Sequence, residues 1–213
     1  MASISRFITQ IGQGVKPNMF SVQIPFPAGV AGIPSDGSIG GFELTNLLCK
    51  SAALPGSSLG VIEVPFRGRT IKIAGDRTFD TWSATFFNDK DMNTRGYFEN
   101  WLNAINNHNL NGADLPNLAV GAAGGAGGTG ASYSVDVTVN QLERTSETQD
   151  TTPNTNKQII RGYTLKYAFP TSVSQIDLAY DSNDQIEEFS VEFQYSYWQS
   201  TASRNSGAGA INK

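Results

Sequence analysis

The strongest constraint on the fold is the stretch from Glu188 to Trp198, where polar and apolar side chains alternate. Its apolar members are Phe189, Val191, Phe193, Tyr195 and Tyr197. A period of two is typical of a strand with one buried face. The preceding segment, Phe169 to Ser182, is predicted to be its hairpin partner through a turn at residues 181–184. The chain is therefore expected to be mainly antiparallel sheet.

The same alternation recurs upstream and predicts about eight strands in all. The other predicted strands are residues 20–24, 42–53, 60–64, 70–74, 81–88, 133–141 and 159–169. Leu54, Pro55, Gly56 and Ser57 have the chemistry of a turn that reverses the chain. A hairpin would then extend from Lys50 to Arg69.

One segment has a helical period instead. The apolar residues Tyr97, Phe98, Trp101, Leu102 and Ile105 are spaced one, three and four apart. This spacing predicts one amphipathic helix between Asn93 and Asn106, started by a cap at Asn93 or Thr94. Such a helix needs a sheet to pack against.

Two glycine-rich stretches, residues 25–41 and 121–130, are predicted to be loops, and a third, polar loop covers residues 145–157. None of these loops is expected to divide the chain. All-β folds often reach this length without dividing, so residues 1–213 are expected to form a single domain.

Composition narrows the functional classes. Charged residues make up 16% of the chain and the formal net charge is -4, so a basic nucleic-acid surface is not expected. Cys49 is the only cysteine, which suits a reducing compartment. The N-terminus lacks a signal-peptide core, and no stretch has the ~20 apolar residues that span a bilayer. We expect a soluble protein that is made in the cytoplasm.

Residues suited to catalysis or metal binding are few. His108 is the single histidine and is expected to be an exposed loop residue, while Cys49 is expected to have a buried apolar role. The run at 121–130 leads into a strand and has no lysine, which disfavours phosphate binding. The acidic residues Asp181, Asp184, Glu187 and Glu188 lack EF-hand spacing. Rather than a calcium site, the two aspartates are expected to belong to a hairpin turn and the two glutamates to the solvated start of a strand. No catalytic residue, cofactor or metal is therefore expected.

An all-β chain with several edge-capable strands favours assembly, because pairing between copies covers the strand edges. Pairing across subunits could close a ring, and a loop such as Leu54–Leu59 could reach a neighbouring ring.

The chain resembles the tail tube proteins of contractile-tailed bacteriophages. The resemblance is carried by five blocks in family order, which are Leu48–Ser57, Ile62–Phe66, Ile71–Asp80, Phe98–Asn106 and Tyr180–Trp198. It implies an antiparallel β-sandwich or half-barrel with one flanking helix and no enzymatic activity. Homohexameric rings would form a β-barrel around a lumen and stack into an inner tube through which phage DNA passes.

The resemblance also implies partners and a location. The expected partners are copies of the chain itself and the tail sheath, tape measure, baseplate and tail terminator proteins, with no membrane contact. DNA would cross the lumen without specific binding, as an acidic wall would favour. The expected location is the virion tail, after assembly in the host cytoplasm.

Site residues follow by position in the resemblance. The hairpin from Lys50 to Arg69 would stack one ring on the next, with its reaching tip at Leu54, Pro55, Gly56 and Ser57 and with Arg67 and Arg69 on the returning side. Glu188 and Glu192 are predicted to face the lumen. The stretches 25–41 and 121–130 resemble insertions relative to shorter family members.

Two alternatives remain open. A ring-forming tube protein of a contractile secretion or toxin-injection system would share the fold. A carbohydrate-binding β-sandwich would need exposed aromatic side chains or a calcium site, whereas Trp82, Trp101 and Trp198 are expected to be core or strand residues.

Overall fold

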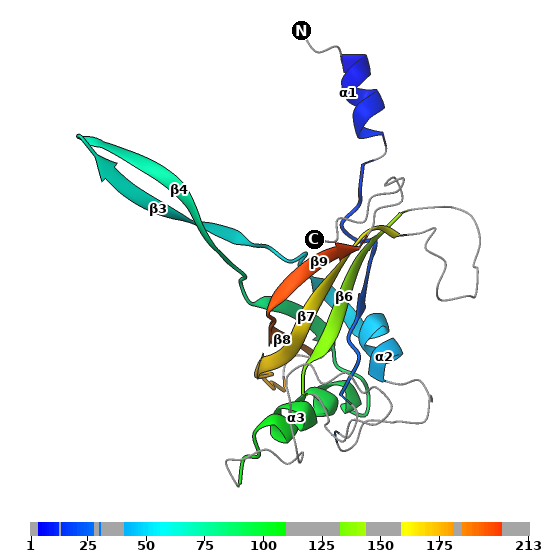
Figure 1. Cartoon of the computed structure of the whole chain (residues 1–213). Coiled ribbons are helices and arrows are strands. Elements are labelled where there is room, and N and C mark those ends of the chain that lie inside the picture. Colours follow the sequence, from blue (N-terminus) through cyan, green and yellow to red (C-terminus); the bar gives the residue numbers. More distant parts are fainter. Residues whose placement is uncertain are drawn as a thin grey trace, which may run out of the picture.

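The computed structural model describes residues 4–12, 14–27, 30, 41–109, 133–143, 159–180 and 185–201 (Figure 1). Its elements are α1 (Ile4–Ile11), β1 (Phe20–Gln23), α2 (Gly41–Leu48), β2 (Cys49–Ala52), β3 (Ser58–Phe66), β4 (Arg69–Thr78), β5 (Trp82–Phe87), α3 (Asn93–Ile105), β6 (Val135–Leu142), β7 (Ile159–Val173), β8 (Glu188–Gln194) and β9 (Tyr197–Thr201). The predicted loops at 121–130 and 145–157, the turn at 181–184 and residues 31–40 lie outside the described residues.

The strands of the described residues form two antiparallel sheets. The larger has the order β1-β6-β7-β8-β5-β2, with β9 also paired to β7, and the smaller consists of β3 and β4 alone. The long strand β7 joins the two halves of the larger sheet, because its first part pairs with β6 and β9 and its last part with β8. The prediction of a mainly antiparallel β fold is confirmed.

The predicted strand from Glu188 to Trp198 is interrupted where the larger sheet bends. The prediction of one continuous strand from Glu188 to Trp198 was wrong, because the chain leaves strand geometry at Tyr195 and Ser196 before β9 begins. The bend lies opposite Tyr167, whose φ of 58° is in the left-handed region. The Ser196 amide still donates to the Lys166 carbonyl at 3.0 Å. An irregularity of this kind bends the strand and increases the local twist of the sheet.

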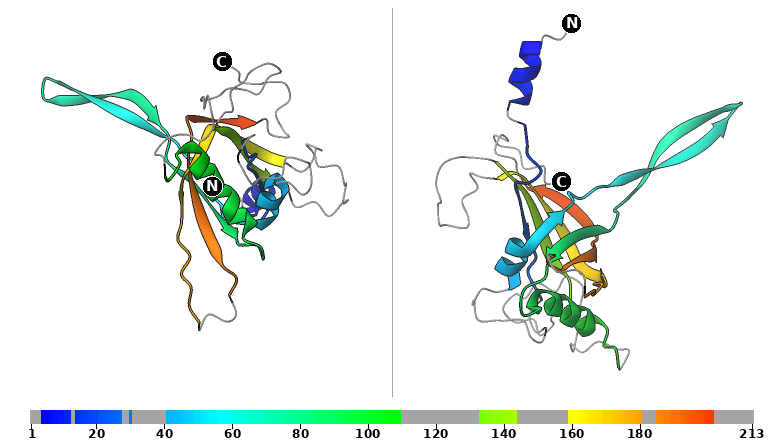
Figure 2. Two further views of the ribbon diagram at one scale, coloured as in Figure 1. Left: turned by 90° about the horizontal axis from the view of Figure 1, so that it is seen from below. Right: turned by 180° about the vertical axis from the view of Figure 1, so that it is seen from behind.

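The core lies between the larger sheet and α3. The predicted inward face of β8 is buried, with Phe189, Val191 and Phe193 at most 1% exposed. Phe98 and Trp101 of α3 are fully buried against it, as the helical spacing predicted. In Figure 1 and in the right view of Figure 2, α3 lies at the lower end of the molecule. Trp101 also donates its indole N–H to the Tyr133 carbonyl at 2.9 Å.

The first turn of α3 is capped by a side chain that the sequence analysis did not identify. Neither Asn93 nor Thr94 acts as the predicted cap; instead their amides donate to the Asp89 carboxylate at 3.2 and 2.8 Å. Partial burial would raise the pKa of Asp89, but these amide donors outweigh it and hold the pKa below its usual value. Asp89 therefore satisfies two of the orphan amides of the first turn.

The segment from Phe42 to Ala53 is a further correction. We predicted a strand, but residues 41–48 form α2 and only Cys49–Ala52 form a strand. The leucines at positions 44, 47 and 48 have a spacing of three and four, which suits a helix as well as a buried strand. A contact with a distant strand favours the helix over the strand. The Asn46 side chain accepts a hydrogen bond from the Val22 amide at 3.1 Å, which joins α2 to β1. The described chain thus has three helices where one was predicted.

Candidate functional site

The residues weighed for catalysis or metal binding lie partly within the described part of the chain. His108 is exposed after α3, as predicted, and Asp181 and Asp184 lie outside the described residues. Glu187 accepts a hydrogen bond from the Asn88 side chain at 3.0 Å, and Glu188 is paired with a lysine. Across the described residues, no three or more His, Cys, Asp or Glu side chains come together to hold a metal ion. No described helix is both long and apolar enough to cross a membrane.

Cys49 gives a prediction about reactivity. Its side chain is partly buried against the core, and burial raises the pKa of its thiol to about 12, although a hydrogen bond with the backbone of Ser51 acts in the opposite direction. At pH 8 its thiolate fraction should be about a thousandfold below that of a thiol with the usual value of 9.0. Iodoacetamide should therefore label it about a thousandfold more slowly in the native protein than in urea. Equal rates in the two states would contradict this.

The most distinctive surface is an arm formed by β3 and β4. This hairpin projects far from the larger sheet (Figures 1 and 2) and pairs from Ser58–Thr78 to Phe66–Arg69, with one shift of register between Leu59 and Val61. Apart from Gly75, every residue of its two strands is exposed. The arm therefore buries almost nothing within one chain.

The two faces of the arm differ in chemistry. Residues paired across the hairpin share a face, which places five large apolar side chains on one side, namely Ile62, Val64, Phe66, Ile71 and Ile73. Each remains between 42% and 58% exposed. The other face carries the Glu63–Lys72 ion pair at 3.6 Å. We call the first side the apolar arm face.

An isolated two-stranded hairpin is marginally stable in water, and an uncovered row of large apolar side chains marks an interaction surface. The cross-strand pairs Val64–Ile71 and Ile62–Ile73 contribute only part of the stability that packing against a second layer would give. The apolar arm face therefore has the character of an interaction surface.

The tip of the arm is not where the sequence placed it. We predicted a reversal at Leu54–Ser57, but the strands turn at Arg67 and Gly68, whose φ values are 46° and 82°. Two consecutive residues with positive φ, the second a glycine, are typical of a two-residue hairpin turn. Arg67 and Arg69 therefore lie at the reaching end of the arm.

Leu54, Pro55, Gly56 and Ser57 lie at the base of the arm, where they connect β2 to β3. The Gly56 carbonyl accepts a hydrogen bond from the Trp198 indole at 3.0 Å. Just before them, the Ala53 carbonyl accepts one from the Trp82 indole at 2.6 Å. These bonds tie the segment to the body, so it anchors the arm.

The two predicted lumen carboxylates belong to the outer face of β8. Glu188 and Glu192 are exposed, while Phe189 and Val191 between them point into the core. Glu188 is ion-paired with Lys50 at 2.5 Å, and Glu192 lies opposite Ser83 of β5. The sheet thus presents a polar outer face at this point, as the alternation predicted.

A second uncovered element is the helix α1. Figure 1 shows it standing apart from both sheets. Ile4, Phe7, Ile8 and Ile11 are between 53% and 79% exposed and share one side of the helix. Their spacing of three and four was visible in the sequence and is the signal by which α1 could have been found.

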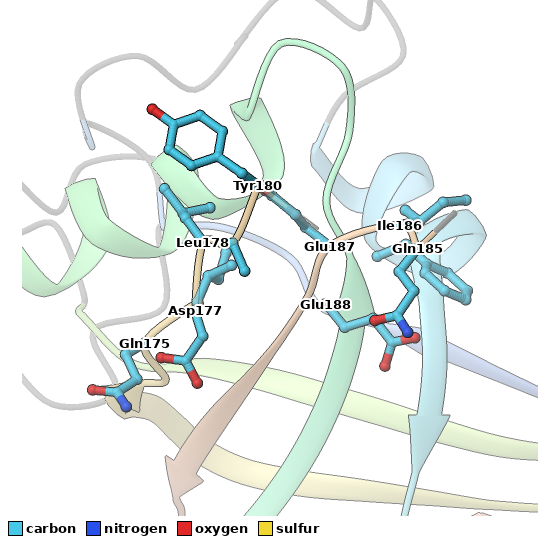
Figure 3. Close-up of a pocket in the computed structure, with 11 residues that line it drawn as sticks. Gln175, Asp177, Leu178, Tyr180, Gln185, Ile186, Glu187 and Glu188 are labelled. Carbon is cyan, nitrogen blue, oxygen red and sulfur yellow. The ribbon is translucent and has the colours of Figure 1, made fainter. Parts of the chain in front are cut away.

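An open groove lies where the chain leaves β7 and returns to β8. It has a volume of about 1050 Å³ and is lined by Phe87, by residues 175–180 on one limb and by residues 185–188 on the other. Figure 3 shows side chains from both limbs lining it, with Asp177 on one limb and Glu187 and Glu188 on the other. We call it the limb groove. No pattern in the sequence indicated it, because its limbs meet only through the β7–β8 pairing.

Comparisons with known proteins give a consistent result. A family model described as phage tail tube protein matches residues 15–201. The tail tube protein gp19 of Enterobacteria phage T4 is 29% identical over 188 residues, which cover 88% of this chain and 93% of the relative. The tail tube protein of Serratia phage KSP90 is 24% identical and covers 92% of this chain and 95% of its own.

A solved structure shows the same fold. It is a chain in the cryo-EM structure of the anti-feeding prophage baseplate, which is 13% identical and superposes with a TM-score of 0.53. The match covers 87% of this chain and 94% of that chain.

Proposed function

Because the chain belongs to the phage tail tube protein family, we propose that it forms hexameric rings that stack into the inner tube of a contractile tail. The family resemblance found in the sequence is thereby confirmed. A tail tube protein is a structural component and not an enzyme. The number of subunits in a ring and the stacking of rings are parts of the proposal.

The observation that carries the proposal is the arm formed by β3 and β4. Its apolar face is uncovered within one chain, and a copy of the same chain is the partner that a homopolymer supplies at every position. In this proposal the hairpin is the stacking element, with Arg67 and Arg69 at its reaching end. Leu54, Pro55, Gly56 and Ser57 set the direction of the arm from its base.

The outer face of β8 is proposed to line the lumen. Glu188 and Glu192 would give the wall negative charge, and the net charge of -4 is compatible with this. DNA phosphates bind where basic side chains release counterions, so an acidic wall would let DNA pass without binding it. Substitution of Glu192, which does not line the limb groove, is thus expected to affect DNA passage more than tube formation.

The proposed partners are the sheath that surrounds the tube, the tape measure protein in its lumen, and the baseplate and tail terminator proteins at its ends. The solved structure that shares the fold comes from a baseplate, and this supports a place among such components. The proposed location is the virion tail, with assembly in the host cytoplasm.

A tube protein of a contractile injection system is the second candidate, since the anti-feeding prophage chain shares the fold. The two phage relatives favour a phage tail. Capsid and terminase genes next to the gene for this chain would indicate a phage tail, whereas secretion-system genes there would indicate an injection system. A carbohydrate-binding role is not favoured, because Trp82 and Trp101 are at most 2% exposed and form no surface platform.

Negative-stain electron microscopy of the purified full chain tests the proposal. We expect hollow tubes of uniform width with six subunits in each ring. Persistent monomers over a wide range of protein and salt concentrations would contradict self-assembly. Rings with another number of subunits would contradict the hexamer alone.

A further inference from the structure

We propose that the tip of the arm of one copy docks into the limb groove of a second copy. This inference rests on the proposed function, since it names the surface that receives the arm in the assembled tube. Two surfaces carry it: an acidic groove with apolar walls, and a basic tip with an aromatic side chain.

The limb groove combines apolar walls with negative charge. Its apolar lining includes Phe87, Ile176, Leu178 and Ile186, and the last two are 81% and 69% exposed. Its carboxylates are Asp177, Glu187 and Glu188, of which Glu188 is already paired with Lys50. Within the described residues, no cation pairs with Asp177 or Glu187. Both carboxylates therefore lack a cationic partner among the described residues, although Glu187 accepts a hydrogen bond from the Asn88 side chain at 3.0 Å.

The arm tip has the opposite chemistry. Arg67 and Arg69 flank Gly68, and the Arg67 guanidinium lies 5.3 Å from the centre of the Phe66 ring. Phe66 itself is 58% exposed. Neither arginine is paired with a carboxylate in the described part of the chain. The tip thus offers two positive charges beside one aromatic ring.

The occupant must come from a second copy. In Figure 2 the arm and the strands that lead to the limb groove extend from the body in different directions, so the tip cannot reach the groove of its own chain. The volume of about 1050 Å³ slightly exceeds the roughly 300–1000 Å³ that is usual for ligand pockets, so this open groove has room for a turn of two residues with Phe66. Complementary charge would also fix the orientation of the docked tip.

A charge-swap experiment tests this docking. One variant reverses the tip (Arg67→Glu with Arg69→Glu), a second reverses the groove (Asp177→Lys with Glu187→Lys), and a third combines all four changes. Each reversal alone places like charges together and should raise the critical concentration for tube formation at least about tenfold. The combined variant restores the attraction and should return to within about threefold of the unchanged chain.

Lys90→Glu and Asp91→Lys are matched controls, because both side chains are exposed and belong to neither surface. They should leave the critical concentration unchanged, and thermal unfolding of each monomer checks that the fold is intact. If the reversals have no effect, or if the combined variant stays as defective as they are, the docking is overturned. If the unchanged chain forms tubes in that case, the proposed function still holds. If the unchanged chain forms no tubes, the proposed function and the docking are both overturned.

Discussion

Replacement of Ile71 and Ile73 by aspartate should abolish tube formation at protein concentrations where the unchanged chain polymerises completely. Both side chains lie on the apolar arm face and are 52% exposed, so their remaining apolar area is available for burial against another copy. Covering each isoleucine contributes about 1 kcal/mol, and an unpaired carboxylate in the same contact costs several kcal/mol more. The critical concentration should therefore rise by a factor of roughly 1000.

The measurement is sedimentation of polymer across a concentration series, with microscopy of the pellet. Thr70→Asp with Ala74→Asp is the matched control, because it adds the same charge to the same strand on the opposite face. The control should raise the critical concentration far less. Both monomers should unfold near the temperature of the unchanged chain, since the arm is outside the core. Normal polymerisation of the Ile71 and Ile73 variant would show that the apolar arm face is not an interface.

Replacement of Phe98 by alanine should lower the free energy of unfolding more than any other substitution proposed for this chain. This side chain is fully buried, and its ring packs within 5.3 to 6.2 Å of the rings of Phe26, Phe86, Phe189 and Phe193. Removal of a buried phenylalanine costs about 3–5 kcal/mol, which is a large fraction of the roughly 5–15 kcal/mol that holds a typical domain. The melting temperature should fall by about 10 °C or more.

Urea and thermal unfolding of the monomer measure this loss. Phe7→Ala in α1 is the matched control, because it removes the same side chain from a position that is 64% exposed. Its free energy of unfolding should change by less than about 0.5 kcal/mol. A small effect at Phe98 would mean that α3 is not part of the cooperative core.

Several elements could be predicted from sequence because their signals are local. The alternation around Phe189 and Val191 placed a buried strand face correctly, and the spacing of Phe98 and Trp101 placed α3 to within one residue at its end. The strands on either side of Arg67 and Gly68 were also predicted, although the turn between them was not recognised as the tip. Local periodicity reports which side of an element is buried and not what covers it.

The errors arose where distant residues decide the local structure. Leu54–Ser57 has the composition of a turn, but the Gly56 carbonyl is held by Trp198 at a separation of 142 residues, so the segment became an anchor. The spacing in Phe42–Ala53 suited both a helix and a strand, and contact with β1 favoured the helix. The start of α3 is a local exception, because the Asp89 carboxylate, four and five residues earlier, accepts hydrogen bonds from the amides of the predicted cap residues Asn93 and Thr94.

The sequence by itself determined that the chain is mainly antiparallel sheet with a buried aromatic face on β8 and one long amphipathic helix, because those signals repeat over a few residues. Tertiary structure alone decided that β8 ends at Gln194, since the bend depends on Tyr167 in the neighbouring strand. It also decided that β3 and β4 leave the body with their apolar face uncovered. Whether an apolar side chain is covered depends on what lies across from it in space, and residues far apart in the sequence settle that.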